Sequence, residues 1–473
     1  MKTKSTIKFF ISLTAIILVA VNCIYAQIVT PAVISDNMVL KRNSTAKIWG
    51  WGKSADEVYV VAEWNLSDTV RVKCDPNGKF LAEINTPEAG GPYIIKIVGK
   101  TSQKLISNVL IGEVWLCSGQ SNMQMSMSSL FGTEVEFANE MATVNNPQIR
   151  TFRVPLIGAD TPQIDCKANW EECSSKTISD VSLTAYFFAK KLQEELNIPV
   201  GIVMSSWGGT NAEVWIPERA QTEALDKCNK VAGNRLWKPT QTGKLYNSMI
   251  YPLVPFDFSG TLWYQGESNV PYYQYYDSIM RSLIDSWRED FTENMPFYFV
   301  QIAPHTYSSV SKDKSAYLRE QQLMTASHDN CGMVVINDII EDVTNIHPKT
   351  KPQVGARLAD MALSRHYMME GYDSKYPEVG DITVCDKKII VTFNNCDNGI
   401  VLLDEKSSSG FKIAGEDGIF VDANVKLDSN TITLSSKSVK SPIYVRYLFD
   451  DSSTCGVQGT NGLPLIPFRN DNL

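Results

Sequence analysis

The sequence predicts an α/β protein whose middle domain is a three-layer α/β/α sandwich, with one β-rich domain before it and another after it. Between residues 108 and 375, short apolar runs typical of buried strands alternate with amphipathic helical stretches. This alternation favours a mainly parallel sheet covered by helices on both faces. In residues 27–107 and 376–473, short β-rich runs are separated by turns. A chain of 473 residues is also too long for one ordinary domain.

The segment before these domains, residues 1–26, is predicted to be a secretory signal peptide. Three lysines precede an apolar run at 9–21, and the segment ends on the small residue Ala26. We expect cleavage after Ala26 and export to the periplasm or the extracellular space, because the run is shorter than the roughly 20 residues that span a bilayer. An uncleaved anchor and a lipid on Cys23 are alternatives, and Asn22 is a poor residue for the second.

The N-terminal domain, 27–107, is predicted to be a small β-sandwich. Its β-rich runs are at 46–50, 58–62 and 93–98. The segments 76–78 and 89–92 contain the glycine, proline and asparagine typical of turns.

Two patterns of apolar residues predict the strands and the helices of the middle domain, 108–375. Continuous apolar runs predict buried strands at 109–116, 200–205, 258–263 and 297–302. Helices are predicted at 181–196, 275–287 and 354–368, the first from the spacing of its apolar residues. In the C-terminal domain, 376–473, the predicted strands are 382–384, 389–393, 431–434 and 444–449. We expect this domain to be structural and to pack on the middle one, and glycan binding is the alternative.

Composition and charge exclude several classes of protein. Hydrophobic residues make up 44% of the chain and charged residues 20%, as in soluble globular proteins. The net charge is −8 and no basic run is dense enough for a nucleic-acid surface, so we expect no nucleic-acid partner. After the leader, no apolar stretch is long enough to span a membrane, so no stable membrane insertion is expected. The oligomeric state is not predicted.

Cysteine and histidine usage predicts no structural metal. The ten cysteines match no common zinc spacing, and the chain has four histidines. Cys166 with Cys173, and Cys385 with Cys396, are close enough in sequence to form local disulfides. Cys117, inside a predicted buried strand, is expected to be a free core thiol.

A serine stands directly after the first strand of the middle domain. The apolar run ends in the small-residue turn Ser-Gly-Gln-Ser at 118–121. A serine where a strand gives way to a turn can expose its hydroxyl above the sheet, beside free backbone N–H groups that hold an oxyanion. Ser121 is therefore a candidate nucleophile, and capping of the following helix is the alternative.

Four segments, in order along the chain, resemble the sialate O-acetylesterase family, a branch of the SGNH-type hydrolases. They are Gly-Gln-Ser-Asn-Met at 119–123, Ser-Trp-Gly-Gly-Thr at 206–210, Trp-Tyr-Gln-Gly-Glu-Ser-Asn at 263–269 and Ile-His-Pro-Lys at 346–349. The likeness continues at 35–40 and 462–469. The resemblance implies an SGNH-hydrolase-like fold for the middle domain. It also implies an exported serine esterase that removes O-acetyl groups from a sugar or glycan, sialic acid first, without a metal or organic cofactor.

The resemblance also implies roles for individual residues. Ser121 would be the nucleophile that becomes acetylated, and His347 would act as general base and then general acid. The oxyanion donors would be the backbone N–H groups of Ser121 and Gly209, with the side chain of Gln265. Glu267 would orient a neighbouring group or contact the sugar, with a structural ion pair as the alternative.

The chain departs from the family pattern at the third position of the catalytic triad. Relatives commonly have an aspartate three or two residues before the histidine, where this chain has Thr344 and Asn345. Asp338, Glu341 and Asp342 are nearby substitutes. The alternative is a Ser–His dyad whose ring is oriented by a backbone carbonyl or by Asn345.

Other assignments stay open at the level of sequence. The aromatic residues next to the motifs either stack on sugar faces or belong to the core; they are Trp115, Trp207, Trp263 and Tyr264. Among the other three histidines, His305 is the one serious competitor of His347 for the role of base, and it could instead line the pocket. The same chemistry on xylan or mannan is an alternative function, and a non-catalytic glycan-binding protein is another.

Overall fold

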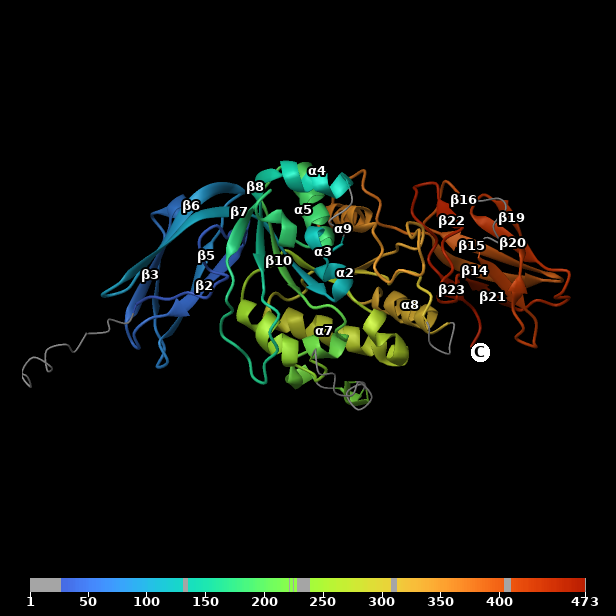
Figure 1. Cartoon of the computed structure of the whole chain (residues 1–473), viewed down its shortest axis with the longest axis horizontal. Helices are drawn as coiled ribbons and strands as arrows, with labels where there is room; N and C mark the ends of the chain where they lie inside the picture. The colour runs from blue at the N-terminus through green and yellow to red at the C-terminus, as the bar shows by residue number, and fades with distance from the viewer. Residues whose placement is uncertain are drawn as a thin grey trace, which may run out of the picture.

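The computed structural model describes residues 27–130, 135–220, 222–223, 225–227, 239–307, 313–403 and 410–472. The predicted signal peptide, 1–26, lies outside the described residues. The molecule is elongated, with a β-rich part at each end and a middle part in which helices flank a sheet (Figure 1). The predicted α/β class with two flanking β-rich domains is confirmed. Within the described ranges, no helix has the length and apolar composition needed to cross a membrane.

The middle part is built on a mainly parallel sheet with the strand order β13-β12-β11-β7-β10-β8-β9. The antiparallel edge strand β9 pairs with β8, and the other neighbours in this order are parallel. The strands are β7 (Gln103–Gly119), β8 (Asn145–Arg153), β9 (Trp170–Ser174), β10 (Val200–Ser206), β11 (Gly260–Tyr264), β12 (Phe297–Val300) and β13 (Cys331–Val334). Strands β10 to β13 are fully buried, as continuous apolar runs predict.

Helices cover both faces of this sheet. Figure 1 shows α5 (Leu183–Leu196) and α9 (Lys351–Arg365) on one side, and α7 (Tyr276–Asp290) and α8 (Lys314–Thr325) on the other. α5 begins at a capping bond, because Ser182 Oγ accepts the N–H of Ala185 at 3.2 Å. The three predicted helices are confirmed, although α9 starts at Lys351, three residues earlier than expected.

Shorter helical segments complete the middle part. They are α2 (Ser121–Gln124), α3 (Met127–Leu130), α4 (Val135–Thr143), η2 (Ile178–Asp180), η3 (Ala212–Trp215), η4 (Glu218–Ala220), η5 (Tyr246–Ile250), η6 (Tyr251–Leu253) and η7 (Glu267–Tyr275). α2 and η7 each begin within two or three residues of a strand end, and both carry residues of the predicted site.

The N-terminal part shares a strand with the middle sheet. Its elements are β1 (Val39–Lys41), β2 (Thr45–Trp51), β3 (Glu57–Ala62), η1 (Glu63–Asn65), β4 (Thr69–Lys73), β5 (Lys79–Asn85) and β6 (Gly90–Val98). The amino-terminal half of β7 pairs with β6 and its carboxyl-terminal half pairs with β10 and β11. The predicted division between residues 107 and 108 therefore falls inside one continuous strand.

The C-terminal part has two four-stranded antiparallel sheets around a core of its own. Its strands are β14 (Glu378–Cys385), β15 (Lys388–Asn394), β16 (Ile400–Leu402), β17 (Phe411–Ala414), β18 (Val421–Asp422), β19 (Asn424–Asp428), β20 (Thr431–Ser435), β21 (Tyr444–Tyr447), β22 (Val457–Gly459) and β23 (Phe468–Arg469). It packs on α8 through buried polar groups. Asp451 Oδ1 accepts both the N–H and the hydroxyl of Ser315, at 2.9 and 2.7 Å.

The two local disulfides considered from the sequence are wrong. Cys166, Cys173, Cys385 and Cys396 are all free thiols. In the β14–β15 hairpin Cys385 pairs with Lys388, whereas Cys396 lies beyond the opposite end of β15, so the strand length separates the two sulfurs. Cys117 is completely buried and free, as predicted.

Candidate active site

Three of the four sequence motifs meet at the carboxyl edge of the middle sheet. Gly119, the last residue of β7, is in register with Ser206 on one side and with Tyr264 on the other. Gly119 has φ +133°, and a Cβ at this position would lie 2.2 Å from the carbonyl oxygen of Tyr264. Glycine is therefore required for this close approach. The edge of a parallel sheet formed by strand carboxyl ends is a common place for active sites.

Ser121 is the first residue of α2 and its side chain faces the fourth motif. Its Oγ lies 2.9 Å from Nε2 of His347. The N-cap position belongs to Gln120, and α2 has no side-chain capping bond, so the capping interpretation of Ser121 is wrong. The hydrogen bond joins residues 226 positions apart and places a hydroxyl against a ring nitrogen, as nucleophilic catalysis by serine requires.

His347 has the electrostatic environment of a general base. Its ring is half-buried, and burial, followed by the nearby Lys351 and His305, lowers the pKa of the imidazole below its usual 6.5. The neutral form therefore predominates at neutral pH. With its proton on Nδ1, the neutral ring offers the lone pair of Nε2 to the hydroxyl of Ser121.

The carboxylates near His347 in sequence are engaged elsewhere. Asp338 forms two hydrogen bonds with the guanidinium of Arg357, at 2.7 and 2.5 Å. Asp342 accepts the N–H and the hydroxyl of Thr344, at 2.9 and 2.6 Å, and these bonds hold its pKa below the usual value. Within the described ranges, no carboxylate forms a hydrogen bond or ion pair with the His347 ring.

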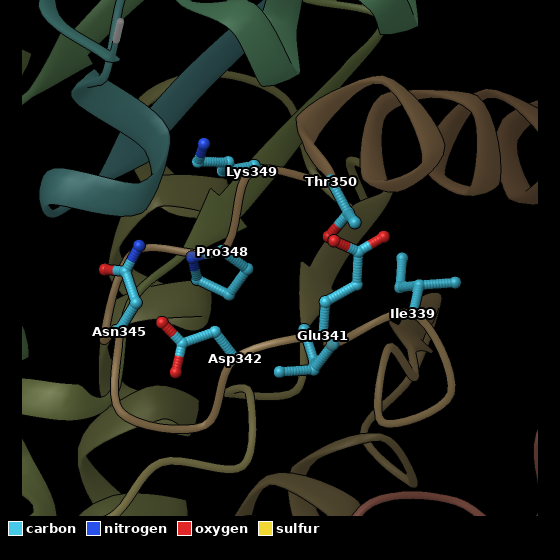
Figure 2. Close-up of a pocket in the computed structure, with 8 residues that line it drawn as sticks. Ile339, Glu341, Asp342, Asn345, Pro348, Lys349 and Thr350 are labelled. Atoms are coloured by element: carbon cyan, nitrogen blue, oxygen red, sulfur yellow. The ribbon is translucent and has the colours of Figure 1, made fainter.

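Glu341 and Asp342 point into a separate pocket of about 250 Å³ beside the His347 loop (Figure 2). Asn345 also lines this pocket, but its Oδ1 accepts the backbone N–H of His347 at 2.9 Å. Asn345 therefore holds the main chain of the histidine, and no hydrogen bond between Asn345 and the ring is found among the described residues. The pocket is lined by Ile339, Ile340, Glu341, Asp342, Asn345, Pro348, Lys349 and Thr350.

The glycine loop after β10 lies against the nucleophile. A Cβ on Gly208 would be 3.3 Å from the Cβ of Ser121, and Gly209 has φ +71°. The N–H of Gly208 donates to Gln124 Oε1 at 2.6 Å. By contrast, the N–H groups of Ser121 and Gly209 have no acceptor among the described residues. They are the free backbone donors that an oxyanion hole needs.

Gln265 is fully buried beneath this loop. Its Nε2 donates to Asn269 Oδ1 at 2.7 Å and to the carbonyl of Thr210 at 3.1 Å, and its Oε1 accepts the hydroxyl of Tyr276 at 2.9 Å. Both amide hydrogens are thus used inside the protein. This geometry suits a role in holding the loop that carries Gly209, and direct donation to an oxyanion stays a prediction.

Glu267 is buried and bound to a residue that sequence reasoning missed. Its Oε1 accepts Nδ2 of Asn122 at 2.5 Å, and burial raises the pKa of its carboxyl group. Asn122 Oδ1 in turn accepts Nζ of Lys351 at 2.7 Å. This bond suits the predicted role in which Glu267 orients a neighbouring group, and that role stays a prediction. The signals for the missed residues were their positions, since Asn122 follows Ser121 and Lys351 lies four residues after His347.

The aromatic residues next to the motifs are mostly core. Trp115, Trp263 and Tyr264 are completely buried. Trp207 is half-exposed, and its N–H donates to the carbonyl of Gly119, so it is the member of the set that a substrate can reach. His305 packs its ring edge-on to Tyr307 and contributes to the lowered pKa of His347, so it lies near the site as expected.

The described residues contain no group of three or more histidine, cysteine, aspartate or glutamate side chains placed to hold a metal ion.

Comparison with known proteins assigns the family. A family model described as carbohydrate esterase, sialic acid-specific acetylesterase, matches residues 111–364. That range is more than half of the chain and includes both Ser121 and His347. The chain belongs to this family of carbohydrate esterases. The resemblance drawn from the four motifs is confirmed.

Relatives and a solved structure agree with the family model. The human sialate O-acetylesterase is 29% identical over 362 residues, which cover 69% of this chain and 68% of that protein. The mouse sialate O-acetylesterase is 30% identical over 389 residues, covering 69% and 71%. The crystal structure of a carbohydrate acetylesterase from Xanthomonas citri is 28% identical, with a TM-score of 0.85 over 94% of this chain and 100% of that one. The predicted SGNH-hydrolase-like fold is confirmed.

Proposed function

We propose that this carbohydrate esterase hydrolyses O-acetyl esters on sugars, with O-acetylated sialic acid as the leading substrate, through an acetyl-Ser121 intermediate. The observation that carries the proposal is the 2.9 Å contact between Ser121 Oγ and His347 Nε2, beside two free backbone N–H groups. The names of the human and mouse relatives support the substrate. We also propose that the protein is exported, on the strength of the leader at 1–26.

In the first half of the reaction, Ser121 is acetylated. Nε2 of His347 takes the hydroxyl proton while Oγ attacks the carbonyl carbon of the acetyl group. The resulting oxyanion accepts hydrogen bonds from the N–H groups of Ser121 and Gly209. The bond between that carbon and the sugar oxygen then breaks, and the imidazolium returns the proton to the departing sugar hydroxyl.

In the second half, water releases the acetyl group. His347 removes a proton from a water molecule, whose oxygen attacks the acetyl-Ser121 carbonyl to form a second oxyanion in the same hole. Collapse of this intermediate breaks the bond to Oγ, and His347 returns the proton to it. The products are acetate and the regenerated serine.

A second substrate class is an acetylated plant glycan such as xylan or mannan. The solved relative from Xanthomonas citri is named only as a carbohydrate acetylesterase, so its name does not favour sialic acid. The contact between Ser121 and His347 argues against a purely glycan-binding function, because binding alone does not require a serine hydroxyl against a ring nitrogen.

The test is acetate release from 9-O-acetylated sialic acid and from acetylated xylan, measured side by side. We expect release from the sialic acid that disappears in Ser121→Ala and persists in Ser54→Ala, which alters an exposed serine of the N-terminal part. Release from xylan alone would agree with the proposed mechanism but would contradict sialic acid as the substrate. Unchanged release by Ser121→Ala would overturn the mechanism.

A further inference from the structure

The main chain around His347 is fixed on both sides. Nδ2 of Asn122 donates to the carbonyl of Ile346 at 3.2 Å, and Nζ of Lys351 donates to the carbonyl of Pro348 at 2.7 Å. These carbonyl groups belong to Ile346 and Pro348, the residues directly before and after the histidine. Together with the bond from its own N–H to Asn345, they leave the backbone of His347 little freedom to turn.

The two side chains that bind these carbonyls are also bound to each other and to the nucleophile turn. Nζ of Lys351 donates to Asn122 Oδ1 at 2.7 Å. Asn122 directly follows Ser121 in α2, and its amide also donates to Glu267. One connected set of hydrogen bonds therefore runs from the residue after the nucleophile to both sides of the base.

The residues of this hydrogen-bonded set are buried, and burying a charged side chain has an energetic cost. Lys351 and Asn122 are 0% exposed and Glu267 is 7% exposed. A buried ammonium destabilises a fold unless oxygen atoms or a counter-charge face it. Here two oxygens accept its hydrogens, the ring of Tyr264 lies 5.4 Å from Nζ, and Glu267 supplies the negative charge. Burial nevertheless lowers the pKa of Lys351 to about 7.

We propose that Lys351 and Asn122 are positioning residues that keep His347 Nε2 on the Ser121 hydroxyl, in place of the carboxylate that the chain lacks at the third triad position. In a serine triad the carboxylate fixes the imidazole through Nδ1. In this chain the same geometric task falls to the main chain of Ile346 and Pro348, the residues on either side of His347. The inference rests on the proposed serine–histidine mechanism. It assigns the residues that orient the base, a role for which the sequence offers no carboxylate at the usual positions.

A lysine differs from a carboxylate in the sign of its effect on His347. A carboxylate stabilises the imidazolium, whereas Lys351 lowers the pKa of the ring. The other charged or titratable groups in this network are His305, which faces the ring, Asp342 and Asp451, which face His305, and Glu267, which faces Lys351. Removing the positive charge of Lys351 should therefore raise the pKa of His347 and loosen its position at the same time.

The test variant is Lys351→Met, which keeps the apolar stem and removes the ammonium. We expect kcat to fall by about 10²-fold, as misplacement of a catalytic group by about 1 Å does, with KM little changed. The acid limb of the pH profile of kcat/KM should move to higher pH. A purely structural role predicts lower thermal stability with an unmoved limb and wild-type kcat per folded molecule, which would overturn the proposal.

Two further variants separate the effect of the charge of Lys351 from the effect of its hydrogen bonds. Lys351→Gln keeps a neutral donor, so we expect it to recover part of the lost kcat while the acid limb stays at the higher pH. Lys191→Met is the matched control, because Lys191 of α5 forms an ion pair with Asp360 of α9 and has no hydrogen bond with His347 or Asn122 among the described residues. Wild-type kcat and an unmoved limb are expected for it, and a loss equal to that of Lys351→Met would overturn the assignment.

A readout without sugar keeps this inference separate from the proposed substrate. The rate at which a fluorophosphonate labels Ser121 depends on His347 and not on the identity of the glycan. We expect labelling of the wild type, and labelling slowed by about the same factor as kcat in Lys351→Met. If the wild type is labelled but releases no acetate, the proposed substrate fails and the positioning role stands. Labelling of Lys351→Met at the wild-type rate contradicts the positioning role.

Discussion

At the scale of single residues, the base has an unusual electrostatic setting. His347 is half-buried, faces a lysine and another histidine, and has no carboxylate on its ring in the described part of the chain. All three of the influences on its pKa act in the same direction, which is downward. Its neutral form is the one that accepts the proton from Ser121, so the lowered pKa extends the active range toward acid.

The pH dependence of activity follows from the lowered pKa of His347. Since protonation of His347 removes the base, kcat/KM should stay level through neutral pH and fall only once the pH drops below 6.5. Initial rates on a small acetyl ester between pH 4 and 8 measure this fall of kcat/KM on the acid side. A limb centred above pH 6.5 would contradict the account of the lowered pKa.

The carboxylates near His347 supply a second prediction at this scale. Asp342 binds Thr344 and lies at an exposed position, so Asp342→Asn should leave kcat within about twofold of wild type. His347→Ala, in the same assay, should lower kcat by about 10²–10⁴-fold because it removes the general base. A loss in Asp342→Asn comparable to that of a triad aspartate, roughly 10⁴-fold, would show that the carboxylate reaches the ring during turnover.

At the scale of elements, α9 connects the site to the body of the fold. Its first residue is Lys351, and its fifth, Gly355, lies against α5: a Cβ on Gly355 would be 2.7 Å from the carbonyl of Thr184 and 2.8 Å from the N of Phe188. The backbones of the two helices are therefore close at this point. The position of α9 on α5 determines where Lys351 and the preceding His347 loop meet α2.

Gly355→Ala tests this packing. Alanine favours a helix over glycine by about 1 kcal/mol, but overpacking a tight contact costs about 1–3 kcal/mol. Because the clash is with backbone, we expect a net loss of stability, measured as a lower midpoint in urea. Gln353→Ala, at an exposed position of the same helix, should leave the midpoint unchanged. Equal midpoints for the two variants would contradict the close approach of α5 and α9.

The elements themselves were largely predictable, and the contacts between them were not. Continuous apolar runs located β10, β11 and β12, because strands buried on both faces have no polar alternation. The same runs could not show that β7 extends from Gln103 into the N-terminal part. Ser121 and His347 were found from local motifs. The bond between Lys351 and Asn122 joins residues 229 positions apart, and no local pattern specifies such a contact.

At the scale of the whole molecule, the middle part is joined to its neighbours in two different ways. The N-terminal part continues the sheet through β7, so the two share one hydrophobic core. The C-terminal part has a separate core and meets α8 through polar groups. The backbone carbonyl of Asp451 also accepts the N–H of His305, which connects this contact to the neighbourhood of His347.

Arg319 of α8 should be the main determinant of the C-terminal contact. Its guanidinium is buried and donates to the carbonyls of Leu448 and Asp450. Arg319→Met leaves those carbonyls without their donor, at a cost of about 1–3 kcal/mol for each unsatisfied group. We expect a lower thermal midpoint and earlier proteolytic cleavage between the middle and C-terminal parts. A midpoint equal to that of the wild type would contradict this assignment.

The central claim, that Ser121 carries the acetyl group with His347 as its base, is tested most directly by trapping the intermediate. The enzyme would be mixed with an acetyl ester, quenched in acid within its first turnover, digested and examined by mass spectrometry. We predict one acetyl group on the peptide that contains Ser121 in the wild type, and none in Ser121→Ala or His347→Ala. Turnover of the ester without acetylation of Ser121, or an acetyl group on another residue, would contradict the account.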